Sequence, residues 1–192
     1  MKPQDEGPAQ SAQELISRSV EETERFGESL GRCLRAGDVI ALVGELGTGK
    51  TTVIRGLAAG LGIERASVRS PTFVLLREYA GRVGLIHVDA YRLEGSEAAV
   101  WLDLAWLFDP RKVTVIEWAD RLSDCLPEDR LELHLRHRTT NQRGLRLLAR
   151  GPRSTQRLAA FREHVHSPQT TVHGKDLGEG QDMEHHIGEW DQ

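Results

Sequence analysis

The stretch Gly44-Glu45-Leu46-Gly47-Thr48-Gly49-Lys50-Thr51 has a glycine, four intervening residues and then Gly-Lys-Thr, which is the pattern of a phosphate-binding loop. Its glycines let the backbone curl so that successive N–H groups point inward at phosphate oxygens. An apolar, β-branched run precedes it at Val39–Val43, and a helical segment follows from Thr51 to Leu61. This order of strand, loop and helix is the context that the motif requires, so the sequence predicts a P-loop nucleotide-binding protein.

The side chains of the loop have distinct expected tasks. Lys50 can reach the β- and γ-phosphates, which also makes it a candidate catalytic residue, and the Thr51 hydroxyl is placed to bind Mg²⁺. The N-terminus of the following helix adds its partial positive charge. The cofactors predicted are therefore ATP and Mg²⁺. The residues predicted to bind the nucleotide are Gly44, Glu45, Leu46, Gly47, Thr48, Gly49, Lys50, Thr51 and Thr52.

Two acids follow predicted strands that come later in the chain. Asp89 follows the apolar run Leu85–Val88, and Glu117 follows Val113–Ile116. In open parallel sheets, ligands bind outside the carboxyl ends of the strands. Both acids are therefore candidate catalytic residues or Mg²⁺ ligands beside the loop. The residues alone leave open which of the two contacts the metal.

Three further features near these strands admit two interpretations each. The segment Ser70-Pro71-Thr72 is either an ordinary turn or a switch whose hydroxyl senses the γ-phosphate. Trp118 either belongs to the core or contacts a partner protein. His87, in the middle of a predicted strand, is interpreted as a packed residue rather than a catalytic one.

The pattern of elements predicts an α/β fold with one P-loop NTPase domain over residues 18–166. Its central sheet is expected to be mainly parallel and flanked by helices, with antiparallel hairpins at the edges. Ser19 and Glu22 form a capping-box pattern that begins the first helix. The remaining elements predicted are the hairpins Phe73–Tyr79 with Val83–Val88 and Leu131–Leu135 with Leu145–Ala149, the strand Val113–Ile116, and the helices Ser96–Phe108 and Thr155–Val165.

The two ends of the chain differ from this domain in composition. Residues 1–17 contain Pro, Gln and Ser and are expected to form a flexible N-terminal arm. Residues 167–192 are Gly-rich and acidic, so a disordered C-terminal tail is expected there. The N-terminus is polar, and no run reaches the roughly 18 apolar residues of a membrane span. We therefore expect a cytoplasmic protein.

An arginine-rich region lies near the end of the predicted domain. Nine Arg and one acid, Glu132, lie between Arg130 and Arg162. These arginines either face RNA or an acidic partner, or form a solvated strand and helix surface. Direct reading of bases is disfavoured, because no pattern of stacking aromatics accompanies them. Contact with tRNA is therefore expected only indirectly or through its backbone.

Four segments occur in one order along the chain: Gly44–Thr52, Ser70-Pro71-Thr72-Phe73, His87-Val88-Asp89-Ala90-Tyr91-Arg92-Leu93 and Val115-Ile116-Glu117-Trp118. Together they closely resemble the TsaE family, the bacterial ATPase needed to make threonylcarbamoyladenosine in tRNA. The resemblance runs from about Ser19 to Ala149, and it is most specific in the Asp-Ala-Tyr-Arg-Leu and Glu-Trp segments. Thr48 departs from the family, which more often has Ala there.

The resemblance implies roles for individual residues of a small Mg-dependent α/β ATPase. By analogy Thr51 and Glu117 hold Mg²⁺, and Asp89 orients or deprotonates the attacking water. Thr23 matches a family threonine that lies near the adenine.

The resemblance also implies partners. These are the TsaB and TsaD proteins, which carry out the threonylcarbamoyl transfer itself. Trp118 and the segment Ser70-Pro71-Thr72 would couple the state of the nucleotide to the interface with them. Hydrolysis would reset the complex between turnovers.

Two other functions are consistent with a phosphate-binding loop. One is a small-molecule kinase, in which Asp89 activates an acceptor hydroxyl. The arginines lie in the predicted C-terminal hairpin rather than in an inserted lid, which disfavours a kinase. The other is a binding module that holds ATP without hydrolysing it.

Overall fold

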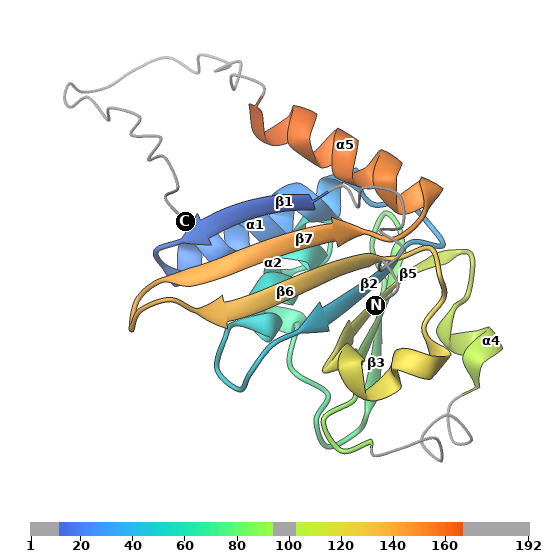
Figure 1. Ribbon diagram of the computed structural model, residues 1–192. Helices are drawn as coiled ribbons and strands as arrows, with labels where there is room; N and C mark the ends of the chain where they lie inside the picture. The colour runs from blue at the N-terminus through green and yellow to red at the C-terminus, as the bar shows by residue number, and fades with distance from the viewer. Residues whose placement is uncertain (1–11, 94–102, 167–192) are drawn as a thin grey trace, which may run out of the picture.

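A seven-stranded sheet with helices packed on it forms the protein in the computed structural model, which describes residues 12–93 and 103–166 (Figure 1). The strands are β1 (Ala12–Ser17), β2 (Val39–Val43), β3 (Leu76–Tyr79), β4 (Gly84–Asp89), β5 (Lys112–Glu117), β6 (Leu131–His137) and β7 (Arg143–Ala149). The helices are α1 (Val20–Cys33), α2 (Lys50–Gly60), α4 (Leu104–Leu107) and α5 (Pro152–His166), with 3₁₀ turns η1 (Arg65–Ser67) and η2 (Ala119–Cys125).

The centre of the sheet is parallel and its edges are antiparallel. The strand order is β1-β7-β6-β2-β5-β4-β3, and the pairs β6–β2, β2–β5 and β5–β4 are parallel. The pairs β1–β7, β7–β6 and β3–β4 are antiparallel. This arrangement confirms the predicted fold class, including both edge hairpins.

The sheet separates two hydrophobic cores. One core joins α1, α2 and α5 to the sheet through buried side chains such as Leu30, Leu57 and Phe161. The second core lies on the opposite face, where Leu107 of α4 and Leu122 of η2 cover the other side chains of the central strands. Because both faces are covered, the central strands carry apolar residues on both sides, as β2 does.

Helices α1 and α2 cross with their backbones in contact. A Cβ on Gly27 of α1 would lie 2.2 Å from the carbonyl oxygen of Val53, and a Cβ on Gly56 of α2 would lie 2.0 Å from that of Glu24. No side chain fits at these positions, so glycine is required there for close approach rather than for a turn. Ser19 caps α1 by accepting a hydrogen bond from the Glu22 amide, which confirms its predicted start.

The predicted N-terminal arm is wrong for its last six residues. Residues 12–17 form β1, which pairs along its whole length with β7 at the edge of the sheet. The segment has weak local strand character, and its backbone is ordered by a partner more than a hundred residues away. Residues 1–11 and the predicted tail, 167–192, lie outside the described residues.

Two other elements differ from their predicted bounds. Strand β3 begins at Leu76 rather than Phe73, because the Pro71 carbonyl accepts hydrogen bonds from Val74 and Leu75 and so forms a turn. The helix predicted from Ser96 is described only as α4, which Asp103 caps, and residues 94–102 lie outside the described residues. None of the helices in the described ranges has the length and apolar character that a bilayer crossing requires.

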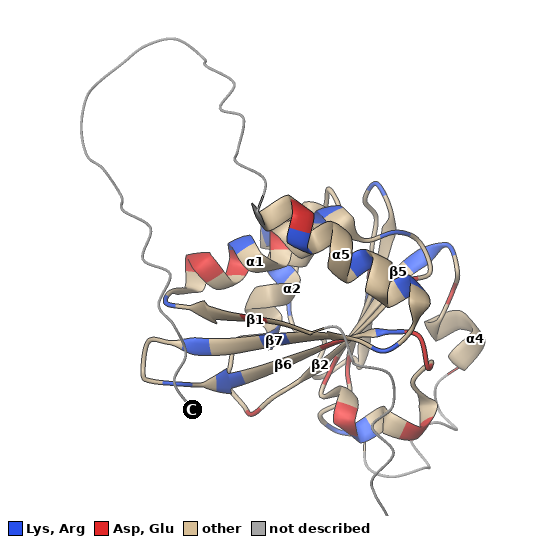
Figure 2. Cartoon of the chain, turned by 45° about the horizontal axis from the view of Figure 1, so that its top comes forward, with Lys and Arg blue, Asp and Glu red and all other residues tan. Residues whose placement is uncertain are grey.

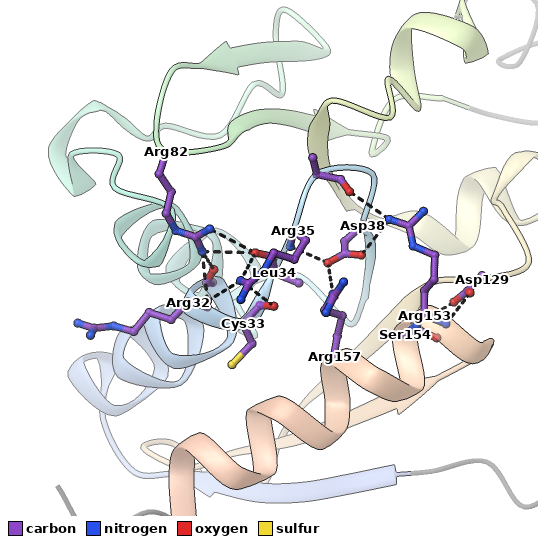
Figure 3. A network of polar contacts seen from close by, with 12 residues as sticks. Arg32, Cys33, Leu34, Arg35, Asp38, Arg82, Asp129, Arg153, Ser154 and Arg157 are labelled. Carbon is purple, nitrogen blue, oxygen red and sulfur yellow. Dashed lines mark hydrogen bonds and ion pairs between the residues drawn. The ribbon is translucent and has the colours of Figure 1, made fainter. Parts of the chain in front are cut away.

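Many of the clustered arginines hold the fold together. Arg130 and Arg150 both bind Glu132, with distances of 2.6 Å between guanidinium nitrogen and carboxylate oxygen. Asp38, before β2, accepts hydrogen bonds from Arg153 and Arg157 of α5, as Figure 3 shows. These contacts join α5 and β7 to the rest of the sheet. Several of these arginines therefore have structural partners within the fold, and the region as a whole is neither wholly a solvated surface nor wholly a surface for nucleic acid.

Replacing Gly56 with Ala should force α1 and α2 apart, because the new Cβ would overlap the Glu24 carbonyl. We expect the free energy of unfolding in urea to fall by about 1–3 kcal/mol, although Ala is the better helix former. Arg25→Ala, on the exposed side of α1, is the control and should change stability by less than about 0.5 kcal/mol. A Gly56→Ala variant as stable as the wild type would contradict the backbone contact.

Replacing Glu132 with Gln should destabilise the protein in a pH-dependent way. Burial alone would raise the pKa of Glu132, but hydrogen bonds and charge from Arg150 and Arg130 outweigh it, and the pKa lies below its ordinary value of 4.5. The ionised carboxylate therefore stabilises the fold at neutral pH, and this contribution disappears as the pH falls below the ordinary value. Urea unfolding should show a deficit of about 1–3 kcal/mol at neutral pH that shrinks in acid. A deficit independent of pH would contradict this role.

Candidate functional site

The carboxyl ends of the four parallel strands meet at one edge of the sheet, and a pocket of about 550 Å³ lies there. The loop after β2 forms one wall. Asp89 ends β4 and Glu117 ends β5, and the two acids occupy matching positions in the parallel register. The residues that line the pocket are Leu46, Gly47, Gly49, Lys50, Thr51, Thr52, Arg55, Ser70, Thr72, Asp89, Tyr91, Glu117 and Trp118.

The backbone of the loop fits tightly between β6 and α2. A Cβ on Gly44 would lie 2.4 Å from the Leu135 carbonyl oxygen, so β6 leaves no room for a side chain there. Gly49 has a φ of 101° and precedes α2 without a side-chain cap. The amide groups of the first turn of α2 therefore lack a side-chain partner, which is the arrangement that receives a phosphate. The Thr48 hydroxyl stays within the loop and donates to the Glu45 carbonyl over 2.8 Å.

Lys50 folds back over its own loop. Its ammonium donates hydrogen bonds to the Gly44 carbonyl at 2.6 Å and the Glu45 carbonyl at 2.8 Å, and it lies 3.6 Å from the centroid of the Trp118 ring. Burial lowers the pKa of Lys50, and the charges of Glu117 and Asp89 oppose that shift. The ammonium is thus held at the pocket wall, beside the position where phosphate oxygens would lie.

Glu117 is held from two sides. The Thr51 hydroxyl lies 3.0 Å from its Oε1 and 3.1 Å from its Oε2, and Nε2 of His87 lies 2.8 Å from Oε1. His87 is fully buried, and its Nδ1 has no hydrogen-bond partner among the described residues. His87 is packed, as the sequence indicated, but it also fixes the position of a carboxylate at the site. The sequence could have indicated this role, because strand alternation along β4 puts His87 on the same face as Asp89.

Asp89 is bound by the predicted switch segment. Its Oδ2 accepts hydrogen bonds from the hydroxyls of Ser70, at 2.8 Å, and Thr72. Its Oδ1 accepts one from the Tyr91 amide at 3.0 Å. Pro71 does not line the pocket, but its carbonyl closes the turn that presents the two hydroxyls. Three hydrogen bonds therefore keep this buried carboxylate aimed at the pocket.

The donor set suits a hard cation that shares its ligands with phosphate. Thr51 and Glu117 present a hydroxyl and a carboxylate at the same point, and Mg²⁺ in nucleotide sites commonly uses few protein oxygens plus phosphates and water. In the described parts of the chain, no group of three or more His, Cys, Asp and Glu side chains is arranged to hold a metal by itself. The pair therefore fits Mg²⁺ bound together with a nucleotide.

Thr23, predicted to lie near the nucleotide, does not line the pocket, whereas Arg55, which was not predicted, does. Thr23 is fully buried beside the loop, but its hydroxyl is occupied by Ser17, at 2.7 Å, and by the Ser19 carbonyl. It does not line the pocket. Arg55 does line it and was not predicted, although it lies four residues after Thr51 on α2 and so shares its face of the helix.

Comparison with known proteins identifies the family. A family model described as "Threonylcarbamoyl adenosine biosynthesis protein TsaE" matches residues 17–145. The chain belongs to the TsaE family. The match includes the loop, both acids and the switch segment.

Individual TsaE relatives agree with this assignment. The TsaE protein of Treponema pallidum is 42% identical over 121 residues, which are 63% of this chain and 89% of the relative. The TsaE protein of Streptomyces coelicolor is 46% identical over 114 residues, 57% of this chain and 76% of the relative. The crystal structure of YdiB from Bacillus subtilis superposes with a TM-score of 0.73 at 29% identity, covering 83% of this chain and all of YdiB.

Membership of the TsaE family connects the chain to threonylcarbamoyladenosine biosynthesis in tRNA. The P-loop NTPase-like fold of the family implies nucleotide binding. The family also implies a complex with other Tsa proteins.

Nucleotide binding should change the fluorescence of Trp118. A phosphate would draw the Lys50 ammonium away from the loop carbonyls and the indole ring, and so alter the surroundings of the fluorophore. We expect a change of tryptophan emission on titration with ATP that is lost in Trp118→Phe. Trp106→Phe, on α4, is the matched control and should keep it. An equal change in both variants would show that the emission change does not arise from Trp118.

Proposed function

We propose that this TsaE-family protein binds Mg-ATP in the loop pocket and hydrolyses it, so that hydrolysis resets the tRNA threonylcarbamoylation complex between turnovers. The observation that carries the proposal is the pairing of two buried carboxylates at the aligned ends of β4 and β5, beside Lys50 and Thr51. Nucleotide binding alone does not require Asp89, a second acid that is separate from the Mg²⁺-binding residues Thr51 and Glu117.

Each residue has one task in the proposed reaction. Lys50 leaves its loop carbonyls and binds the β- and γ-phosphates. Thr51 and Glu117 would hold Mg²⁺, which would neutralise charge on the phosphates, and His87 keeps Glu117 in position. Asp89 orients the attacking water and accepts its proton as the bond between the β–γ bridging oxygen and the γ-phosphorus breaks. The products are ADP and inorganic phosphate.

The switch segment is proposed to couple the nucleotide to Asp89. In the structure the hydroxyls of Ser70 and Thr72 donate to Asp89. When they donate to the γ-phosphate instead, Oδ2 of Asp89 becomes available for water. Loss of the γ-phosphate restores the original hydrogen bonds, so the segment has two arrangements that differ with the nucleotide.

The surroundings of the pocket support a protein partner. Leu46 and Tyr91, which line the pocket, are 77% and 42% exposed, and Phe73, next to the lining residue Thr72, is 85% exposed. Large apolar side chains on the rim of a site suit a protein interface. We propose that this rim, together with Trp118, contacts TsaB or TsaD in the cytoplasm, with tRNA touched only indirectly or through its backbone.

Lys50→Ala and Asp89→Asn should separate binding from hydrolysis. Lys50→Ala removes a charged phosphate contact, and we expect Mg-ATP affinity to fall about a hundredfold. Asp89→Asn should keep affinity but slow phosphate release about a hundredfold or more. The measurements are calorimetric binding and phosphate release, by the protein alone and with TsaB and TsaD added.

Other outcomes would replace the proposal with a different function. Tight binding without phosphate release under any condition would identify a binding module. A phosphorylated acceptor in place of free phosphate would identify a kinase. Full activity of Asp89→Asn would refute its role toward water.

A further inference from the structure

The turn between β6 and β7 lies at the same edge of the sheet as the phosphate-binding loop. Strand β6 runs parallel to its neighbour β2, so the end of β6 and the loop after β2 emerge side by side. His137 and Arg143 form the last pair before the turn. Figure 2 shows basic residues on the ends of β6 and β7 beside this turn.

The Arg143 side chain extends from β7 onto the loop. Its Nε and Cδ lie 3.4 and 3.5 Å from the point that a Cβ on Gly49 would occupy. On the other flank of the loop, Nε2 of His137 lies 3.9 Å from the equivalent point of Gly47. Arg143 therefore lies beside Gly49, the residue at which the loop becomes α2.

Among the residues that the structure describes, none supplies a counter-charge to the guanidinium of Arg143. It is half-buried, and no described residue in 12–93 or 103–166 forms a hydrogen bond or ion pair with it. By contrast, Arg146 on the same strand pairs with Glu14, and Arg150 pairs with Glu132.

The positive charges that surround Gly49 favour an anion at this position. Arg143 meets the N-terminus of α2, which carries partial positive charge and lacks a side-chain cap. Two positive groups that face each other are stabilised by an anion between them. A guanidinium also matches the oxygens of a phosphate with paired hydrogen bonds.

We propose that Arg143 is a phosphate-binding residue of the nucleotide site, a role that rests on the proposed function. It binds the part of the phosphate chain that lies over Gly49, whereas Lys50 reaches back over the start of the loop at Gly44 and Glu45. Loop amides of this motif cradle the α- and β-phosphates, so Arg143 holds phosphates that ADP and ATP share. The γ-phosphate is left to Lys50 and the switch hydroxyls.

The test is calorimetric binding of Mg-ADP, Mg-ATP and Mg-pyrophosphate to the full chain and its variants. Arg143→Ala should weaken all three by about tenfold or more, and by the same factor for ADP and ATP. Arg143→Lys, which keeps the charge but not the planar fork, should lie between Ala and wild type. Arg146→Ala, on the same strand and paired outside the site, should bind as the wild type does. The unliganded variants should unfold at the same temperature, which separates a lost contact from a lost fold.

Each alternative result would overturn the assignment in a recognisable way. If Arg143→Ala binds normally while Lys50→Ala does not, Arg143 is no ligand and the proposed function stands. If only the nucleotides weaken and pyrophosphate does not, Arg143 contacts the adenosine rather than the phosphates. If ATP weakens and ADP does not, it contacts the γ-phosphate. A wild-type protein that binds none of the three probes refutes the proposed function together with this one.

Discussion

The parallel pairing of β4, β5, β2 and β6 is the constraint on which the site depends. Strands that run in the same direction end at the same edge, so residues far apart in sequence arrive there together. The register then sets the detail, because Asp89 and Glu117 are direct partners and Glu117 also pairs with Leu42, just before the loop. Strand direction and register therefore place Glu117 beside Thr51 and bring Asp89 to the same edge of the sheet.

Much of this arrangement was predictable because its signals are local. The loop, its strand and its helix lie in one continuous stretch, and each acid directly follows an apolar run. The features that were missed depend on distant partners. Residues 12–17 become a strand only beside β7, and His87 acquires a role only when β5 brings Glu117 to it. The turn at Pro71 overrode the strand character of Phe73–Leu75.

The arginines show why composition alone left their role open. A run of basic residues has the same sequence signature whether its charges are compensated or not. The compensating acids, Glu132 and Asp38, lie on different elements and become partners only in the folded sheet. Arg143 differs from Arg146 and Arg150 in the neighbour that the fold supplies, which is a backbone loop rather than a carboxylate.

Strand β1 also determines which surface the protein shows to other molecules. Its pairing satisfies the outer N–H and C=O groups of β7, and its Ser17 binds Thr23 beside the loop. A shortened chain that began after Ser17, as for a dispensable arm, would make β7 the edge strand in place of β1. Open edges accept strands from other molecules. Residues 12–17 therefore decide which strand, β1 or β7, presents its outer backbone groups at this edge of the sheet.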